Sequence, residues 1–321
     1  MPYSKLAQAG WTEKSSPARF SSAPQGRAML TLLHISDLHF GPHYLSEAGE
    51  SLQRFAAELR PDIVVASGDF TQRAKRRQFA NAREFLGRLP DVPLVIVPGN
   101  HDIPLYRIHE RLFSPYGLYR RYMENEGDHV LSHPRAVIAA LNTTSPLRRI
   151  TNGRIRAESL ALCRRAFADA PAGAARIVVA HHPFAPPEDA LGGEIMRGIP
   201  AALEVFAELG VELVLGGHLH RAYSISSLDV CPDPQHTQGV LLVQSGTTTS
   251  GRGRAGEKGK NSLNVIQIDG GSIRVTPHLR GEDGRFAPLA AALHPRAEFD
   301  LANDRKTTAP KTARPFRERA G

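Results

Sequence analysis

The chain has 321 residues, of which 41% are hydrophobic, so it can bury a sizeable core in one large domain or two smaller ones. Its formal net charge of +8 is compatible with an anionic partner, such as a phosphorylated substrate, nucleic acid or an anionic membrane surface, but the gathering of basic residues near the C-terminal end weakens that interpretation. No stretch approaches the roughly 18 consecutive apolar residues of a membrane span. Cys163 and Cys231 form neither a CxxC pair nor a zinc motif, so we expect two reduced thiols in the cytoplasm.

The two ends of the chain differ in composition from its middle. Residues 1–28 are rich in Ser, Ala, Pro and Gln and lack the features of a secretory signal, which predicts a disordered N-terminal extension. We hypothesise that translation starts at Met29, which N-terminal sequencing of the native protein would test. The segment 286–321 is basic, and we expect a flexible tail there rather than a nucleic-acid-binding arm. The folded domain is therefore expected to span residues 29–285.

The first half of that domain alternates between strand and helix patterns. Apolar runs predict buried strands at 30–35, 63–66 and 94–97, and apolar spacing predicts helices over 51–59 and 79–89. This β-α-β-α-β series is typical of a parallel sheet that is covered on both faces.

An aromatic segment at 104–123 follows the third strand and also contains several arginines. It can be interpreted as a helical insertion beside a functional site or as rings that pack into a local core. The pattern alone leaves both interpretations open.

The second half of the domain starts with the same alternation and then changes. Strands are expected at 136–141, 177–180 and 211–215, with helices over 158–168 and just before Gly210. Four later runs have no helices between them, at 223–228, 239–244, 263–268 and 272–275. These runs predict a second, largely antiparallel sheet.

Polar side chains that can bind metals follow five of the expected strands directly. The five groups are Ser36-Asp37-Leu38-His39, Gly68-Asp69, Gly99-Asn100-His101-Asp102, His181-His182-Pro183 and Gly216-Gly217-His218-Leu219-His220. Because sites in open α/β sheets form at the carboxyl ends of strands, we expect the five groups to surround one cleft. Any one of these short patterns is weak, whereas all five in this order are hard to obtain by chance.

The chemistry of these groups fits a pair of metal ions. Asp37 and His39 are two residues apart, so both can turn toward one ion, and His218 and His220 have the same spacing. Asp69 supplies a carboxylate that can bridge two cations. Mixed oxygen and imidazole ligands favour manganese, iron or zinc over calcium. Two such ions can hold a hydroxide between them and polarise a phosphoryl group, so that water rather than a side chain is the nucleophile.

The ordered set D-x-H, G-D, G-N-H-D, H-H-P and G-G-H-x-H resembles the calcineurin-like metallophosphoesterase superfamily over roughly residues 30–275. The runs SGDFTQRA and VPGNHDIP are similar to its bacterial cyclic nucleotide phosphodiesterase-like branch. The resemblance implies an α/β fold, a four-layer α/β/β/α sandwich of two β-sheets flanked by helices, with a dinuclear centre of two divalent or trivalent ions.

The resemblance also implies a role for each matching residue. It places the first ion on Asp37, His39, Asp69 and His220. It places the second ion on Asp69, Asn100, His181 and His218. His101 matches the histidine that approaches the leaving group or the phosphate oxygens, and Asp102 matches the residue that orients this imidazole.

Other residues near these motifs have weaker assignments. His182 is expected to lie outside the ligand set, because adjacent residues on extended backbone point to opposite sides. His34 and His43 are also expected to be non-ligands. Three arginines are candidates for binding phosphate, each with a surface role as the alternative: Arg73, Arg252 and Arg254.

The leading function is hydrolysis of a phosphodiester, nominally a 3',5'-cyclic nucleotide, by attack of a metal-bridging hydroxide, with His101 assisting the leaving oxygen. One alternative is hydrolysis of the pyrophosphate of a nucleotide-diphosphate lipid at an anionic membrane surface, which the basic residues and the aromatic segment would suit. Another is a DNA nuclease, for whose additional domains the chain has little room. A non-catalytic interaction scaffold is the fourth, and the complete ligand set argues against it. The expected partner is thus a small phosphorylated substrate, with an anionic membrane surface as a further candidate.

Overall fold

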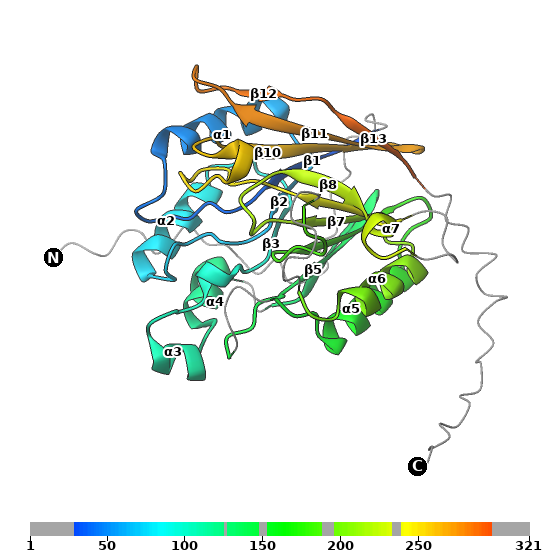
Figure 1. Ribbon diagram of the computed structural model, residues 1–321, viewed down its shortest axis with the longest axis horizontal. Helices are drawn as coiled ribbons and strands as arrows, with labels where there is room; N and C mark the ends of the chain where they lie inside the picture. Colours follow the sequence, from blue (N-terminus) through cyan, green and yellow to red (C-terminus); the bar gives the residue numbers. More distant parts are fainter. Residues whose placement is uncertain (1–28, 125–126, 148–152, 188–195, 233–238, 297–321) are drawn as a thin grey trace, which may run out of the picture.

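The computed structural model describes residues 29–124, 127–147, 153–187, 196–232 and 239–296, and within them two β-sheets pack face to face with helices outside (Figure 1). The expected N-terminal extension, 1–28, lies outside the described residues. In chain order the elements are β1 (Leu30–Ile35), α1 (Ser46–Leu59), β2 (Ile63–Ala66), α2 (Arg76–Leu86), β3 (Leu94–Ile96), a 3-10 turn (Asn100–Asp102), α3 (Ile108–Phe113), α4 (Gly117–Met123), β4 (His129–His133), β5 (Ala136–Leu141), α5 (Ala157–Ala168), β6 (Ala175–Ala180), α6 (Ile199–Glu208), β7 (Leu213–Gly216), β8 (Tyr223–Ser226), α7 (Ser227–Val230), β9 (Leu241–Gln244), a second 3-10 turn (Ala255–Glu257), β10 (Ser262–Ile268), β11 (Ser272–Arg280), β12 (Phe286–Pro288) and β13 (Ala292–Pro295).

Both sheets are mixed. The first has the strand order β12-β11-β10-β1-β2-β3, with β13 also paired to β11, and its only parallel pairs of neighbours are β1-β2 and β2-β3. The second has the order β4-β5-β6-β7-β9-β8, parallel through its centre and antiparallel at its two edge strands. The expected sandwich of two sheets between helices is confirmed.

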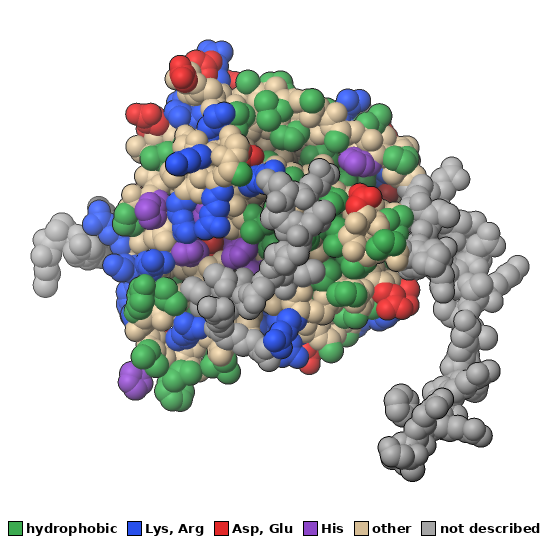
Figure 2. Space-filling model, in the orientation of Figure 1, with side chains coloured by type: hydrophobic (Ala, Val, Ile, Leu, Met, Phe, Trp, Pro, Cys, Tyr) green, Lys and Arg blue, Asp and Glu red, His purple; other side chains and the backbone are tan. Residues whose placement is uncertain are grey.

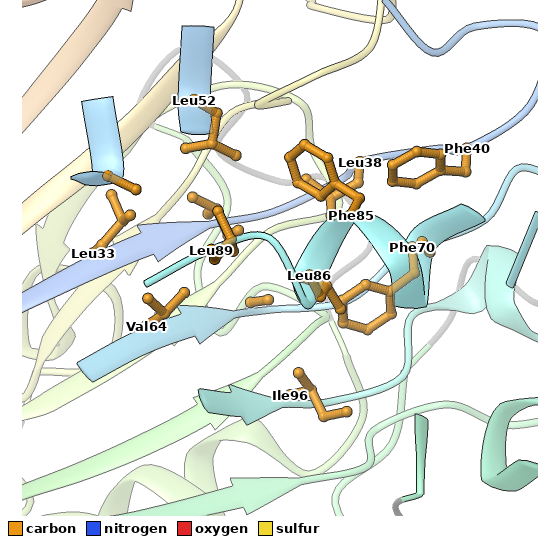
Figure 3. Packing of buried hydrophobic residues seen from close by; sticks show 14 of the residues in the cluster. Leu33, Leu38, Phe40, Leu52, Val64, Phe70, Phe85, Leu86, Leu89 and Ile96 are labelled. Carbon is orange, nitrogen blue, oxygen red and sulfur yellow. The ribbon is translucent and has the colours of Figure 1, made fainter. Parts of the chain in front are cut away.

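The alternation of side chains along the strands explains the layers. On β1, Leu33 and Ile35 face α1 and α2, whereas Leu32 faces the second sheet. Figure 3 shows the outer layer, in which Leu33, Val64 and Leu52 approach one another between the strands and the helices. Because both faces of these strands are buried, their sequences are continuous apolar runs, as the sequence predicted.

The expected separate antiparallel sheet is wrong. β8 and β9 join the second sheet, where β9 runs parallel to β7, while β10 and β11 join the first sheet next to β1. Apolar runs indicate that a segment is a strand, but they carry no information on which distant strand it pairs with. Strand β4 was not predicted, because it is an edge strand whose residues are only partly buried.

The expected boundary of the folded domain at residue 285 is also wrong, since the first sheet continues to Pro295. Strands β12 and β13 both pair with β11, and Phe286 is buried against α1 and its neighbours. These strands are short and lie in a basic segment, so composition concealed them. The rest of the expected tail, 297–321, lies outside the described residues.

Arg296 follows β13 and connects the two sheets. Its Nε donates to Glu212 Oε1 at 2.7 Å and one Nη donates to Glu212 Oε2 at 3.0 Å, from the segment that leads into β7. The other Nη donates to the carbonyl of Asp269 at 2.7 Å, beside the first sheet. Both side chains of the ion pair are nearly buried, at 10% and 11% exposure.

We expect Arg296→Met to lower the free energy of unfolding by about 3 kcal/mol, because it leaves the nearly buried carboxylate of Glu212 without its partner. Urea unfolding followed by circular dichroism measures the change. The control is Arg54→Met, which breaks an exposed pair with Glu50 and should cost no more than about 0.5 kcal/mol. Equal effects of the two substitutions would show that Arg296 does not connect the sheets.

Candidate metal centre

The five polar groups at the strand ends meet at one edge of the sandwich. Three of them follow β1, β2 and β3 of the first sheet, and two follow β6 and β7 of the second. One ligand atom from each of four buried residues lies within 4.8 Å of the other three: Asp37, His39, Asp69 and His220. Residues from both sheets therefore face a common point.

A second group of side chains adjoins the first through Asp69. Asn100 Oδ1 lies 2.8 Å from His218 Nδ1 and 3.2 Å from His181 Nε2. His181 Nε2 in turn lies 3.5 Å from Asp69 Oδ2, which is 3.7 Å from His39 Nε2 on the other side. Asp69 thus stands between the two groups, where a bridging carboxylate would have to be.

The donor atoms at this point fit cations better than they fit one another. Asp37 Oδ1 and Asp69 Oδ2 are buried carboxylate oxygens that receive no hydrogen bond from the described residues. The Nε2 atoms of His39 and His220 lie 3.0 Å apart, and the other nitrogen of the His39 ring, Nδ1, is buried without a hydrogen-bond partner among the described residues. Burying a carboxylate without compensation is costly, and metal ions would supply the missing positive charge.

The backbone at the predicted ligands adopts a conformation that L-residues rarely occupy. Five of these residues have positive φ angles between 49° and 74°: Asp37, His39, Asp69, His218 and His220. In each pair of ligands separated by one residue, both members are left-handed, which turns their side chains to the same side. Gly99 adds a close approach, because a Cβ there would collide with the carboxylate of Asp69.

Neighbouring loops hold this strained backbone in place. The N–H of Asp37 donates to the carbonyl of Gly68 at 3.0 Å, and the N–H of His39 donates to the carbonyl of Asp69 at 2.9 Å. From the loop after β9, the buried hydroxyls of Thr247 and Thr249 donate to the carbonyls of Asp37 and Leu38 at 2.7 and 2.9 Å. Sequence analysis missed these threonines, although a run of hydroxyl residues directly after a buried strand was a usable signal.

Backbone carbonyls orient two of the imidazoles. His181 Nδ1 donates to the carbonyl of Ser67 at 2.7 Å, and His220 Nδ1 donates to the carbonyl of Arg252 at 3.0 Å. Both rings therefore turn Nε2 toward the centre, an arrangement that is common for histidines that bind metals. His182 turns Nδ1 to the hydroxyl of Thr143 at 2.8 Å, and its expected position outside the ligand set stays a prediction.

The buried carboxyl groups and imidazoles of the cluster shift one another's pKa values. Burial alone would raise the pKa values of Asp37 and Asp69. The positive field of the histidines nevertheless holds both pKa values well below their usual range. Burial lowers the pKa of His39 to about 4, whereas Asp69 outweighs burial at His181 and raises its pKa to about 9. Both carboxylates are therefore charged at neutral pH, and a metal ion that binds His181 has to displace a proton.

His101 lies at the rim of this cluster, 4.9 Å from His39 between ring centroids. Its Nδ1 donates to the carbonyl of Gln72 at 2.9 Å, and the guanidinium of Arg252 donates to its Nε2 at 3.1 Å. Because a guanidinium can only donate, Nε2 carries the lone pair. Burial lowers the pKa of His101, which agrees with a neutral ring.

The expected role of Asp102 in orienting His101 is wrong. Its carboxylate is fully buried and accepts from the N–H groups of Gly99, Phe70 and Thr71 at 2.9 to 3.2 Å. Asp102 thus ties the loop after β3 to the loop after β2, while the carbonyl of Gln72 orients the imidazole. Burial, followed by the charge of Asp69, raises the pKa of Asp102 to about 7 against these donors.

The three candidate arginines differ in position. Arg252 contacts both His101 and Gln72 Oε1, at 3.1 and 3.2 Å, and Arg73 places an Nη 3.3 Å from His101 Nδ1. Arg254 has an exposed side chain, and it is its N–H that reaches this region, donating to the carbonyl of His220 at 3.1 Å. Gln72 was not among the residues expected at this site, and no sequence signal marks it.

The sequence model of the calcineurin-like phosphoesterases matches residues 30–222, more than half of the chain. The chain belongs to the calcineurin-like phosphoesterase family. The match begins at β1 and ends just after His220, so it contains every one of the expected ligands.

The individual proteins that resemble this phosphoesterase match different shares of its length. Glycerophosphodiester phosphodiesterase GpdQ of Enterobacter lignolyticus (strain SCF1) is 37% identical over 83 residues, which are 23% of this chain and 30% of GpdQ. Purple acid phosphatase PPD1 from yellow lupin seeds has a TM-score of 0.64 and 13% identity, over 93% of this chain and 58% of that one. A dimetal phosphatase from Danio rerio has a TM-score of 0.57 and 11% identity, over 84% of this chain and 99% of that one. The two structural similarities concern the fold.

His34 lies directly behind the metal centre and is fully buried between the sheets. One ring nitrogen contacts Ser67 Oγ at 3.0 Å and the other contacts the side-chain amide of Asn264 at 3.4 Å, which leaves His34 outside the ligand cluster, as expected. Burial lowers its pKa from 6.5 to about 3.

We expect His34 to make the fold sensitive to acid. Between these two pKa values the unfolded chain binds a proton that the folded chain does not, so stability falls as the pH is lowered, by about 1.4 kcal/mol per pH unit. His34→Gln removes this contribution, and the slope of unfolding free energy against pH between about 6 and 4 should become shallower by that amount. His43→Gln, at an exposed position, is the control. An unchanged slope in His34→Gln would contradict the assignment of a neutral, buried ring.

Proposed function

We propose that this protein hydrolyses a phosphodiester with the help of two metal ions. Manganese and iron ions suit the donor set, and zinc is the alternative. The first ion would bind Asp37, His39, Asp69 and His220. The second would bind Asp69, Asn100, His181 and His218. The observation that carries the proposal is the pair of buried carboxylate oxygens, on Asp37 and Asp69, that face imidazole nitrogens and receive no hydrogen bond from the described residues.

When bound, such ions supply Lewis acidity toward a phosphoryl oxygen and lower the pKa of a water molecule. The chain itself supplies the proton transfer and the anion contacts beside that point. His101 can exchange a proton only at Nε2, because its Nδ1 donates to the carbonyl of Gln72. Arg252 now donates to Nε2, so a phosphoryl oxygen that takes over the guanidinium donors would leave Nε2 free to take up a proton, which the neutral ring must gain before it can give one to the leaving oxygen.

A diester substrate is supported by the sequences. The segment shared with GpdQ belongs to a protein named as a glycerophosphodiester phosphodiesterase. The runs SGDFTQRA and VPGNHDIP resemble the cyclic nucleotide phosphodiesterase-like branch, so 3',5'-cyclic nucleotides and glycerophosphodiesters are the nominal substrates. A panel of aryl phosphodiester, aryl phosphomonoester, cyclic nucleotide, glycerophosphodiester and DNA tests this with manganese added. Turnover of the monoester alone, or of DNA alone, would contradict the proposal.

We expect Asn100→Ala and His218→Ala each to reduce turnover of an aryl phosphodiester by at least about a hundredfold, because each removes one ligand of the second ion. Circular dichroism should show little loss of fold, since Asn100 starts the 3-10 turn after β3 and His218 lies beyond the end of β7, both outside the strands. Metal analysis after dialysis should show fewer ions per chain than in the wild-type protein. Near-normal rates in either variant would mean that the site is wrongly assigned.

We expect Arg252→Ala to lower kcat/KM by about tenfold to a hundredfold, the equivalent of losing one hydrogen bond to a charged phosphate. Arg254→Ala is the matched control, because it removes the same charge from the same loop at an exposed position, and it should change kcat/KM less than about twofold. Steady-state kinetics with the aryl phosphodiester at constant ionic strength compare the two. Equal losses would indicate a general electrostatic effect rather than a contact of Arg252 with substrate.

A further inference from the structure

Exposed hydrophobic side chains gather at one place on the described part of the molecule. The four most exposed large hydrophobic residues there are Phe113, Leu147, Tyr106 and Ile108, with exposures of 66% to 81%. Together with Leu112 they belong to α3 and the segments beside it, and we call these five residues the α3 tip. Figure 2 shows hydrophobic side chains at the lower left, where Figure 1 places α3.

The packing of the fold does not account for this exposure. Helix α3 has no buried residue, whereas the next helix, α4, places Tyr119 and Met123 in the core around Phe79. A helix of six residues has little stability of its own, so contacts at its base must hold it. Large exposed apolar groups of this kind mark interaction sites on soluble domains.

The contacts that hold α3 are polar and lie at its base. Arg107 donates to the carbonyl of Ala74 at 2.8 Å, and Arg111 Nε donates to the carbonyl of Pro146 at 2.6 Å, next to Leu147. Just beyond the helix, the hydroxyl groups of Tyr116 and Thr144 lie 2.7 Å apart. The hydrophobic side chains of the tip are therefore held outward by a polar base, which is the reverse of ordinary helix packing.

Positive charge surrounds the α3 tip. Lys75, Arg76 and Arg77 are exposed at the start of α2, directly after the Ala74 carbonyl that Arg107 binds. Lys and Arg side chains form a band above the hydrophobic group in Figure 2. The acidic residues nearby are neutralised, since Glu110 pairs with Arg107 and Glu124 pairs with Arg83. The charge beside the tip is thus complementary to an anionic surface.

We propose that the α3 tip docks this protein on the surface of an anionic phospholipid bilayer. The apolar side chains of the tip would enter the boundary between headgroups and acyl chains, and Lys75, Arg76 and Arg77 would lie over the headgroups. A second copy of the chain would bring two basic surfaces together, and nucleic acid offers no apolar region for the tip. Charge and hydrophobicity together therefore favour a lipid surface.

Docking here would place the metal centre close to the bilayer. Tyr106 of the tip lies under the guanidinium of Arg73, 5.7 Å from ring centroid to Cζ, and Arg73 contacts His101. The described residues contain no helix that is long and apolar enough to cross a membrane, so the contact would be peripheral. The docking surface rests on the exposure of α3 and not on the proposed hydrolysis.

Co-sedimentation of the full chain with vesicles tests the docking surface. Vesicles of phosphatidylglycerol and phosphatidylcholine in roughly equal parts are compared with vesicles of phosphatidylcholine alone. The wild-type protein should bind the anionic vesicles and leave the neutral ones largely unbound. The double variant Ile108→Glu/Phe113→Glu should bind at least about tenfold more weakly, because it places two carboxylates where the apolar side chains would enter.

The matched control is Leu289→Glu/Leu293→Glu, which makes the same change at exposed leucines near β12 and β13, on the opposite side of the molecule in Figure 1. It should bind the anionic vesicles within about threefold of wild type, since it adds the same charge without touching the tip. Thermal unfolding and turnover of a soluble aryl phosphodiester should be unchanged in both double variants, which separates a failure of docking from a failure of the proposed function.

Several results would overturn the proposal. The proposal is overturned if the wild-type chain does not bind anionic vesicles, or if the tip variant binds them as strongly as the control variant does. A concentration-dependent dimer that Ile108→Glu/Phe113→Glu dissolves would identify a second copy as the occupant. Binding to DNA that the same variant abolishes would identify nucleic acid instead.

Discussion

Two buried carboxylates without enough hydrogen-bond donors are the constraint on which the rest of this structure depends. Asp37 and Asp69 each have an oxygen that faces histidine nitrogens in a fully buried position. Only positive charge stabilises such an arrangement, and the histidines around the two oxygens lower the pKa of both carboxyl groups. The loops, the strained backbone and the hydroxyls behind them all serve to keep these oxygens together.

The strained backbone at the expected ligands costs a free energy that is a sizeable fraction of the stability of an ordinary domain. Five left-handed residues at roughly 1 kcal/mol each amount to a substantial part of the roughly 5–15 kcal/mol that typically separates folded from unfolded protein. The sandwich offsets this cost with three apolar layers, and the loops after β2, β3 and β9 fix the strained segments by hydrogen bonds. A site built in this way is rigid before substrate arrives, which suits chemistry that relies on positioning.

Much of the metal centre could be predicted from the sequence, because its residues follow directly from the strands. The parallel strands β1, β2 and β3 carry their polar ends to the same edge, so short motifs were enough to bring Asp37, Asp69 and Asn100 together. Gln72 was missed because it acts through its backbone carbonyl, which no spacing rule reveals, whereas Thr247 was missed although a run of hydroxyl residues follows β9 directly. Asp102 was misassigned for a related reason, since its partners are backbone groups of another loop.

The fold was predictable to the level of elements and layers and no further. Continuous apolar runs identified nearly all the central strands. The sheet that each of the strands β8, β9, β10 and β11 joins depends on contacts between distant segments, which a sequence pattern does not encode. The exposed side chains of α3 lie in a segment whose place in the fold the sequence did not decide. The sequence left the aromatic segment open between core and insertion, and the structure divides it, with α4 in the core and α3 outside.

Elemental analysis of the purified, active protein, repeated on Asp69→Ala, tests the metal centre most directly. The proposed site predicts close to two equivalents of transition metal per chain in the wild-type protein, and loss of both ions with all turnover when the carboxylate proposed to bridge them is removed. Active protein that contains no metal, or Asp69→Ala that keeps both ions, would contradict it.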